Sequence, residues 1–256
     1  MPTGSETGRR VCLLTGAGGT LGSAFCQAYG AHYDIVAVAR HRVPVVPSQD
    51  EWFVDPLAPE AELPENDGRV YVVRSDLEQP GQVERVVDLA LARHGRVDLL
   101  VNAAAYSVWH APGLVDGDRL IDTVDRHFAV NVGIPLRLAT RLAQRFWMGN
   151  DLDNRAQNRN IVNVSSLAGS RVYPGGQAVY AASKAALNQL TRHMAAEFAE
   201  FGLRANALAP NSFPSIVSTE SVVKAIARLD ADTVTGKVLV MDGDSPGSAG
   251  TAAPAD

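Results

Sequence analysis

The stretch Val-Cys-Leu-Leu-Thr-Gly-Ala-Gly-Gly-Thr-Leu-Gly, residues 11–22, decides the fold. Its apolar first half predicts a buried strand, its glycines predict a sharp turn, and the residues after it have the apolar spacing of a helix. Glycines at 16, 18, 19 and 22 let the backbone approach an anion closely, and the free amides that begin the next helix attract it. The stretch therefore predicts a phosphate-binding strand–turn–helix unit, although such turns also occur for tight packing alone.

Outward from this unit, short apolar runs alternate with amphipathic helical patterns. The helical patterns cover 20–31, 80–94, 118–147, 177–201 and 218–229. Because parallel neighbouring strands need a crossover, usually a helix, the alternation predicts an α/β fold. We expect a single-domain, doubly wound, seven-stranded parallel sheet of the Rossmann type with helices on both faces. The predicted strands are Val11–Leu14, Ile35–Ala39, Val70–Val73, Val97–Val101, Ile161–Val164, Arg204–Ala207 and Lys237–Met241.

Two kinds of segment break this rhythm. Prolines are too frequent in 41–69 for a regular long helix, so an irregular surface insertion is expected there. The ends, 1–8 and 244–256, have little to bury and are predicted to be flexible. The domain itself is then 9–243.

The composition limits the classes of function. The chain has 256 residues, 46% of them hydrophobic, which is ample for one buried core. A net charge of -5 gives no basic surface for nucleic acid or an anionic membrane, and no apolar run approaches the ~20 residues that span a bilayer. Cys12 and Cys26 show no metal-ligand spacing and are expected to be core thiols. A cytoplasmic protein whose partners are a small molecule and copies of itself is predicted.

The glycine-rich turn resembles the first turn of the short-chain dehydrogenase/reductase family, Thr-Gly-x-x-x-Gly-x-Gly. Thr15, Gly16 and Gly22 match, whereas Thr20 replaces the middle glycine. The resemblance extends over residues 10–243 and implies a nicotinamide dinucleotide cofactor.

The second predicted strand indicates which cofactor. Ala39 stands where an NAD-selective enzyme would have a carboxylate for the ribose hydroxyls. Arg40, His41 and Arg42 follow, and a guanidinium suits a 2′-phosphate through paired hydrogen bonds. NADPH/NADP+ is therefore the predicted cofactor, with Arg40 as its main phosphate ligand. The alternative is that these are solvated loop charges.

The resemblance also implies further contacts with the cofactor. Asp76 would bind the adenine amine with help from the backbone of Leu77, and Asn102-Ala103-Ala104-Ala105 stands in place of the family's Asn-Asn-Ala-Gly. No metal ligand is predicted. The predicted cofactor-binding residues are Gly16, Gly18, Gly19, Thr20, Leu21, Gly22, Arg40, Asp76, Leu77, Asn102, Ala103, Ala104, Tyr180, Lys184, Pro210, Asn211 and Phe213.

The segment Tyr-Ala-Ala-Ser-Lys puts Tyr180 and Lys184 on one face of a predicted helix, a spacing that is common in helices of any kind. The resemblance adds Asn131 and Ser166, which complete the family's Asn-Ser-Tyr-Lys set. It implies that Tyr180 exchanges the proton, Ser166 polarises the substrate carbonyl and Asn131 holds a water. Lys184 would lower the pKa of Tyr180 and hold the nicotinamide ribose.

The choice of serine has an alternative. Ser166 and Tyr180 are fourteen residues apart, one more than is usual in the family, so Ser165 could be the working serine instead. We favour Ser166 because adjacent residues of a strand point in opposite directions and a loop can absorb one extra residue.

The segment after the sixth predicted strand is short. Pro210 is retained from the family's Pro-Gly turn, and Asn211, the best substitute at positive φ, replaces its glycine. Only 213–235 then separates this turn from the last strand, so the lid at 212–235 is reduced. A shallow pocket is expected, for a bulky or carrier-bound substrate or with walls from another subunit or from 41–69.

These observations predict an NADPH-dependent reductase of a ketone or aldehyde in a small or secondary-metabolite substrate. One alternative is reduction of the C=N bond of an imine or pterin. An alternative of another class is a non-catalytic dinucleotide-sensing or scaffold protein. A homodimer or homotetramer is expected to form through the helices 118–147 and 177–201.

Overall fold

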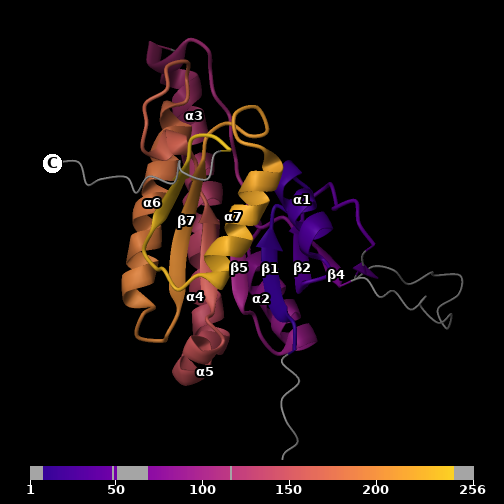
Figure 1. Ribbon diagram of the computed structural model, residues 1–256. Helices are drawn as coiled ribbons and strands as arrows, with labels where there is room; N and C mark the ends of the chain where they lie inside the picture. Colours follow the sequence, from indigo (N-terminus) through magenta and orange to yellow (C-terminus); the bar gives the residue numbers. More distant parts are fainter. Residues whose placement is uncertain (1–7, 48, 51–68, 116, 245–256) are drawn as a thin grey trace, which may run out of the picture.

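The computed structural model describes residues 8–47, 49–50, 69–115 and 117–244, in which every strand belongs to one sheet (Figure 1). All neighbouring strands pair in parallel, in the order β3-β4-β2-β1-β5-β6-β7-β8. The doubly wound parallel α/β fold predicted from the sequence is confirmed. The strands are β1 Arg10–Thr15, β2 Tyr33–Ala39, β3 Gln49–Asp50, β4 Val70–Arg74, β5 Leu99–Asn102, β6 Asn160–Val164, β7 Arg204–Pro210 and β8 Val238–Met241.

Helices connect these strands. The α-helices are α1 Thr20–Tyr29, α2 Gln82–His94, α3 Gly117–Phe128, α4 Ile134–Leu142, α5 Asp151–Ala156, α6 Ala178–Glu197 and α7 Thr219–Ala231. Two short 3-10 helices, η1 Gly113–Val115 and η4 Leu167–Gly169, lie in loops. No helix in the described ranges is long and apolar enough to cross a membrane.

The region 118–147, predicted as one helix, is divided by two wider turns. The π-helical segments η2 Ala129–Gly133 and η3 Ala143–Trp147 follow α3 and α4 respectively. A π turn holds one residue more than an α turn, so it changes which side chains face the sheet. The apolar spacing showed a helix but not this change of pitch.

Both faces of the sheet are buried. On β1, Leu13 belongs to the core formed with α2, α4 and α6, whereas Cys12 and Leu14 belong to the core formed with α1 and α7. Successive side chains of a strand point to opposite faces, so a strand covered on both sides must be apolar throughout. This explains the continuous apolar runs in the sequence.

The edge strand β3 departs from the prediction. It lies within the segment expected to be wholly irregular, and it pairs with β4 through the register Gln49↔Tyr71 and Asp50↔Val72. A two-residue strand is too short to leave a periodic signal in the sequence. Residues 48 and 51–68 of that insertion lie outside the described residues, as do 1–7 and 245–256 of the two predicted flexible ends.

Both cysteines lie in the core next to β1, as expected of core thiols. Cys12 and Cys26 are free and buried. Burial raises the pKa of Cys26 to about 12 and raises that of Cys12 as well. Both groups are therefore protonated at neutral pH, which makes them poor nucleophiles.

A buried ionic network joins the amino ends of the strands. Arg159 donates from Nε to Oδ1 of Asp98 over 3.0 Å, and both side chains are 3% exposed. The other carboxylate oxygen of Asp98 accepts the backbone N–H of Val11 at 2.9 Å. Nearby, Arg10 makes two 2.8 Å bonds to the carboxylate of Asp230. These pairs connect β1, β6 and α7 at the edge opposite the carboxyl ends of the strands.

Removal of one partner from the buried pair should strongly destabilise the fold. Asp98→Ala removes the buried counter-ion of Arg159, which keeps the exposed carboxylate of Asp153 at 2.7 Å, so the loss should reach the lower part of the range of about 3–5 kcal/mol for a broken buried pair. Asp88→Ala is the control, because Asp88 is 44% exposed and its ion pairs join it only to surface arginines. Urea unfolding measures both free energies. An equal, small loss in the two variants would contradict a structural role for the network.

Candidate active site

A cavity of about 380 Å³ opens at the carboxyl ends of β1, β2, β4 and β5. Four segments contribute most of its lining: the glycine-rich turn, the end of β2 with the residues after it, the residues after β4 and the residues after β5. The lining residues are Gly16, Gly18, Gly19, Val38, Ala39, Arg40, His41, Arg42, Ser75, Asp76, Leu77, Glu78, Ala103, Ala104, Ala105, Tyr106, Arg126, Val130 and Ile134. Residues far apart in the sequence meet here because parallel strands all end at this edge.

The glycine-rich turn packs tightly against the backbone of neighbouring segments. Gly16 has φ +69°, which favours glycine, and a Cβ there would lie 2.7 Å from the backbone N of Ala104. A Cβ on Gly18 would lie 1.6 Å from the carbonyl oxygen of Arg42, so no larger residue fits. The hydroxyl of Thr15 accepts the N–H groups of Ala103 and Ala104, each at 3.1 Å. The turn is thereby fixed to the segment that follows β5.

The helix that follows this turn presents its amino end to the cavity. Gly19 is the N-cap of α1, and the first turn of α1 contains no acidic residue. The first amides of a helix have no intrahelical acceptor, so the end of α1 can receive a phosphate. Thr20, Leu21 and Gly22 lie inside the helix, and their side-chain positions do not line the cavity.

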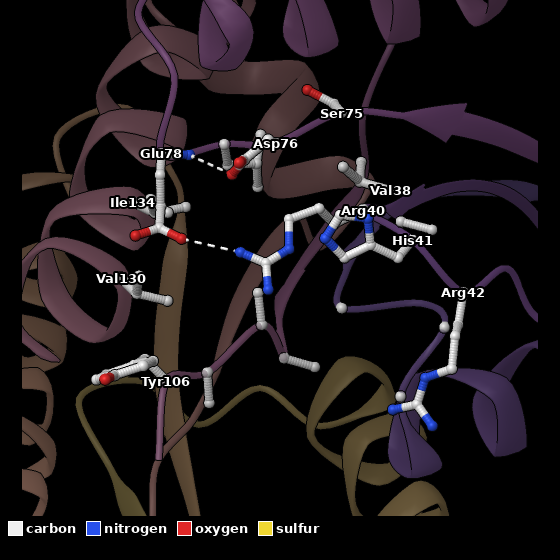
Figure 2. A pocket seen from close by; sticks show the side chains of 18 of the residues that line it. Val38, Arg40, His41, Arg42, Ser75, Asp76, Glu78, Tyr106, Val130 and Ile134 are labelled. Atoms are coloured by element: carbon white, nitrogen blue, oxygen red, sulfur yellow. Dashed lines mark hydrogen bonds and ion pairs between the residues drawn. The ribbon is translucent and has the colours of Figure 1, made fainter. Parts of the chain in front are cut away.

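The side chain of Arg40 reaches across the cavity (Figure 2). Its Nη1 donates to Oε2 of Glu78 at 3.0 Å. Arg126, from α3, donates to both oxygens of the same carboxylate at 2.8 Å. Sequence reasoning missed Glu78 and Arg126, because neither belongs to a motif and only the folded sheet brings them together.

The residues predicted to bind the adenine side of the cofactor differ in whether their side chains face the cavity. Asp76 and Leu77 line the cavity, and Asp76 Oδ1 accepts the N–H of Glu78 at 3.1 Å. Asn102 turns its side chain into the protein, where Nδ2 donates to Asn163 at 2.8 Å. Its predicted contact with a cofactor would therefore use the backbone.

A second cavity, of about 250 Å³, lies at the same edge of the sheet, beside β6 and β7. No Asp, Glu, Lys, Arg or His side chain belongs to its lining, and its side chains are aromatic, hydroxyl, amide or small. The lining residues are Ser107, Trp109, Ser165, Ser166, Ala168, Tyr173, Gln177, Tyr180, Pro210, Asn211, Ser212 and Phe213.

The two candidate serines differ in direction. Ser165 is buried and its hydroxyl donates to the carbonyl oxygen of Lys184 at 3.2 Å. Ser166 accepts the N–H of Ala168 at 3.2 Å, lines the second cavity together with Tyr180 and acts on the pKa of that phenol. The geometry therefore favours Ser166 as the partner of Tyr180 and gives Ser165 a local role.

The ionisation of Tyr180 is governed here by burial. Burial raises the pKa of this phenol, and the side chain of Ser166 opposes the rise only in part. Lys184 Nζ lies 5.8 Å from the centre of the tyrosine ring and donates to the carbonyl of Val164 at 2.9 Å. The ammonium of Lys184 is directed at a backbone carbonyl, and the lowering of the Tyr180 pKa by Lys184 together with an oxidised nicotinamide stays a prediction.

Lys184 itself is an unusual group. It is 2% exposed, and burial lowers its pKa to about 8. A lysine buried without a carboxylate partner costs folding free energy, and such groups gather at functional sites.

Asn131 lies in the π-helical segment η2 and is 1% exposed. Its Oδ1 accepts the N–H of Tyr106 at 2.8 Å, while Nδ2 donates to the carbonyl of Tyr106 and to the hydroxyl of Ser183. The side chain thus fixes the loop after β5 to α6, next to Lys184. Since both amide protons are used within the protein, any water-holding role would fall to the backbone.

Asn211 does not have the backbone conformation expected of it. Among the described non-glycine residues, only Asn158 has positive φ. The N–H of Asn211 donates to the carbonyl of Met241 at 2.7 Å, and its side chain donates to Asp242. These bonds fix the end of β7 to the end of β8. The asparagine replaces glycine here for its hydrogen bonds and not for positive φ.

The reduced lid is compensated by two loops that sequence reasoning missed. The helix α7 in the 212–235 segment packs on the core beside α1 (Figure 1). Its residues are not among those that line the second cavity. The cavity walls come from Ser107 and Trp109 on one loop and Tyr173 and Gln177 on another. A backbone bond of 3.4 Å from His110 to Gly176 joins these loops.

Two cavities on one sheet edge suit a dinucleotide. The glycine-rich turn, the helix end and Asp76 fit a nucleotide with its phosphates, and the residue that would bond the carbonyl of a substrate lies in the second cavity. The residues present therefore fit a nicotinamide dinucleotide.

Comparison with known proteins agrees with this geometry. Residues 10–225 match the family described as short chain dehydrogenase. The chain is similar to protein FixR of Bradyrhizobium diazoefficiens, with 32% identity over 230 residues that cover 86% of this chain and 73% of that protein.

Two solved structures are also similar. A short-chain dehydrogenase/reductase family oxidoreductase from Brucella ovis, in complex with a partially ordered NAD, has a TM-score of 0.67 and 27% identity, covering 91% of this chain and 100% of that one. A blue fluorescent protein from a metagenomic library, in complex with NADPH, has a TM-score of 0.71 over 92% of this chain and 97% of that one. At 24% identity this second likeness concerns the fold alone. From the family match over residues 10–225, the fold and the site together, the chain belongs to the short-chain dehydrogenase/reductase family of oxidoreductases.

Proposed function

We propose that this protein is an NADPH-dependent reductase that transfers a hydride to the carbonyl of a ketone or aldehyde. The observation that carries the proposal is that Ser166 and Tyr180 line the second cavity together. The pair lies on the same sheet edge as the glycine-rich turn and Arg40. A proton donor beside a dinucleotide cradle is what carbonyl reduction requires.

The cofactor supplies the hydride, and the chain supplies the proton and its position. With its pKa raised by burial, Tyr180 is protonated at neutral pH and is therefore a donor. Reduction places the hydride on the carbonyl carbon, while the carbonyl oxygen takes the proton of Tyr180. Ser166 is the second hydroxyl at that point and would orient the oxygen. Solvent then returns the proton to the phenolate.

The choice of NADPH is supported by Arg40, His41 and Arg42, which line the first cavity directly after Ala39. A 2′-phosphate gains charge-assisted bonds from such groups, whereas none of these three side chains offers a carboxylate to ribose hydroxyls. The Brucella ovis relative was solved with NAD and the metagenomic protein with NADPH, so the fold accommodates either cofactor. Residues of this chain must decide between them.

The lining of the second cavity supports a neutral substrate. Its volume of about 250 Å³ suits a small molecule or one end of a larger one, and its lining includes the aromatic residues Trp109, Tyr173 and Phe213 besides Tyr180. A small or secondary-metabolite carbonyl compound fits these surroundings. An imine or pterin C=N bond would meet the same groups, and the substrate assay below separates the two.

The remaining parts of the proposal concern the whole molecule. Ile121, Phe128 and Leu136 are exposed apolar residues on α3 and α4. They support a homodimer or homotetramer formed through these helices and α6. A cytoplasmic location stays a prediction from the sequence.

Replacement of Tyr180 by phenylalanine should abolish turnover while cofactor binding persists. Loss of the proton donor lowers kcat by about 10²–10⁴. The measurement is NADPH consumption with a panel of neutral ketones, aldehydes and imines. Tyr173→Phe is the matched control, because Tyr173 lines the same cavity and its hydroxyl makes a long bond of 3.4 Å to Asn211. Unchanged turnover in the Tyr180 variant would remove the catalytic assignment, and activity on imines alone would favour C=N reduction.

Lys184→Met should change how stability depends on pH. The pKa of Lys184 is about 8 in the folded protein against an ordinary value of 10.5, so protonation opposes folding. The unfavourable contribution of Lys184 to the free energy of unfolding is full below about pH 8 and absent above pH 10.5. The wild-type free energy of unfolding therefore gains about 3 kcal/mol from this group across that pH range. Urea unfolding at pH 7.5 and 10.5 should show a smaller gain in the variant.

The control for this measurement is Lys224→Met, since Lys224 is an exposed lysine of α7. It should keep the wild-type gain in stability with pH. Equal gains in all three proteins would mean that Lys184 is not buried as an ammonium. Cofactor affinity of the Lys184 variant, measured in parallel, tests its proposed role at the nicotinamide ribose.

A further inference from the structure

Glu78 is a carboxylate inside the cavity proposed for the cofactor, where it faces the side chain of Arg40 (Figure 2). It bonds a second arginine, Arg126, as well. Arg126 contacts it through Nε and Nη2, both at 2.8 Å, and Arg40 through Nη1 alone at 3.0 Å. The three side chains come from three segments: the loop after β2, the loop after β4, and α3. No part of the mechanism described above uses Glu78 or Arg126.

The two arginines hold Glu78 unequally. The pair with Arg126 is bidentate, which is the stronger geometry, and the guanidinium of Arg126 also lies 4.6 Å from the ring centre of Tyr106. Arg40 contributes a single bond and its side chain is 44% exposed. Arg40 can therefore leave while Glu78 keeps both carboxylate oxygens bonded.

The backbone of Glu78 makes a further contact that restrains this residue. Its N–H donates to Oδ1 of Asp76 at 3.1 Å. The carboxylate is thus held near α3, and it draws the side chain of Arg40 across the cavity toward that side. A 2′-phosphate near the end of β2 would need Arg40 to exchange this bond for one to the phosphate. A cofactor without the phosphate needs no such exchange.

We propose that Glu78 is a specificity-determining residue that competes with the 2′-phosphate of the cofactor for Arg40. Arg126 is the positioning residue that retains Glu78 when Arg40 is released. Glu78 thus lowers the affinity for the phosphorylated cofactor below what Arg40 alone would give, and Arg126 limits that loss. This inference rests on the proposed function, in particular on the phosphate role of Arg40.

The test compares ligands that differ only in the phosphate. Dissociation constants of adenosine 2′,5′-bisphosphate and adenosine 5′-monophosphate are measured by calorimetry, and those of NADPH and NADH by fluorescence. For Glu78→Gln we expect the bisphosphate and NADPH to bind about fivefold more tightly, with the other two ligands changed less than about twofold. High salt should reduce the gain, because it screens the exposed charges.

A second variant should act in the opposite direction. In Arg126→Gln, Glu78 keeps Arg40 as its only arginine partner among the contacts described here, so the bisphosphate should bind about fivefold more weakly. In the double variant Glu78→Gln/Arg40→Ala, the tighter binding of the bisphosphate that Glu78→Gln produces should vanish. A purely structural role for Glu78 would not produce this dependence on Arg40. Glu220→Gln, on the surface of α7, is the matched control and should leave all four constants unchanged.

Each other outcome has a definite meaning. If Glu78→Gln tightens or weakens all four ligands alike, or selectively weakens adenosine 5′-monophosphate and NADH, the competition does not exist and the inference is overturned. The proposed preference for NADPH is tested separately. It is wrong if Arg40→Ala alone weakens the binding of NADPH and of NADH equally. The proposed catalysis fails separately again, when Tyr180→Phe retains full turnover.

Discussion

All described strands run parallel, so their carboxyl ends meet at one edge of the sheet, and every feature of the site depends on this constraint. The loops that leave this edge contribute the glycine-rich turn, Arg40, Asp76 and Ser166. The hydroxyl of Thr15 strengthens the arrangement by accepting two backbone N–H groups from the segment that follows the neighbouring strand β5. Site residues that are far apart in the sequence are thereby held close together by one sheet.

Much of this frame could be predicted because its signals are local. Seven strands follow from apolar runs, and Tyr180 and Lys184 follow from a helical spacing that keeps both on α6. The signals that failed are those that depend on tertiary contact. The direction of Lys184 toward Val164, the pairing of Glu78 with Arg126, and the edge strand β3 are set by neighbours distant in sequence. No periodicity or motif encodes them.

The loop that bears Trp109 shows the same limit. A short 212–235 segment correctly indicated that no long lid follows β7, but it gave no reason to expect walls from two other loops. Those loops meet through backbone bonds such as that between His110 and Gly176, which any residue types could make. Side-chain patterns therefore carry little information about them, whereas the backbone geometry shows them directly.

The ionic network of Arg10, Asp98, Arg159 and Asp230 lies at the amino ends of the strands, and the two cavities lie at the carboxyl ends. The groups that hold the sheet together are thus separated by the length of the strands from the groups that bind and react. Loop residues at the carboxyl ends that make no such bonds, unlike Thr15 and Asn211, can change with little penalty in folding. This division makes the scaffold unusually evolvable: new substrate preferences can arise by loop replacement while the anchoring end stays the same.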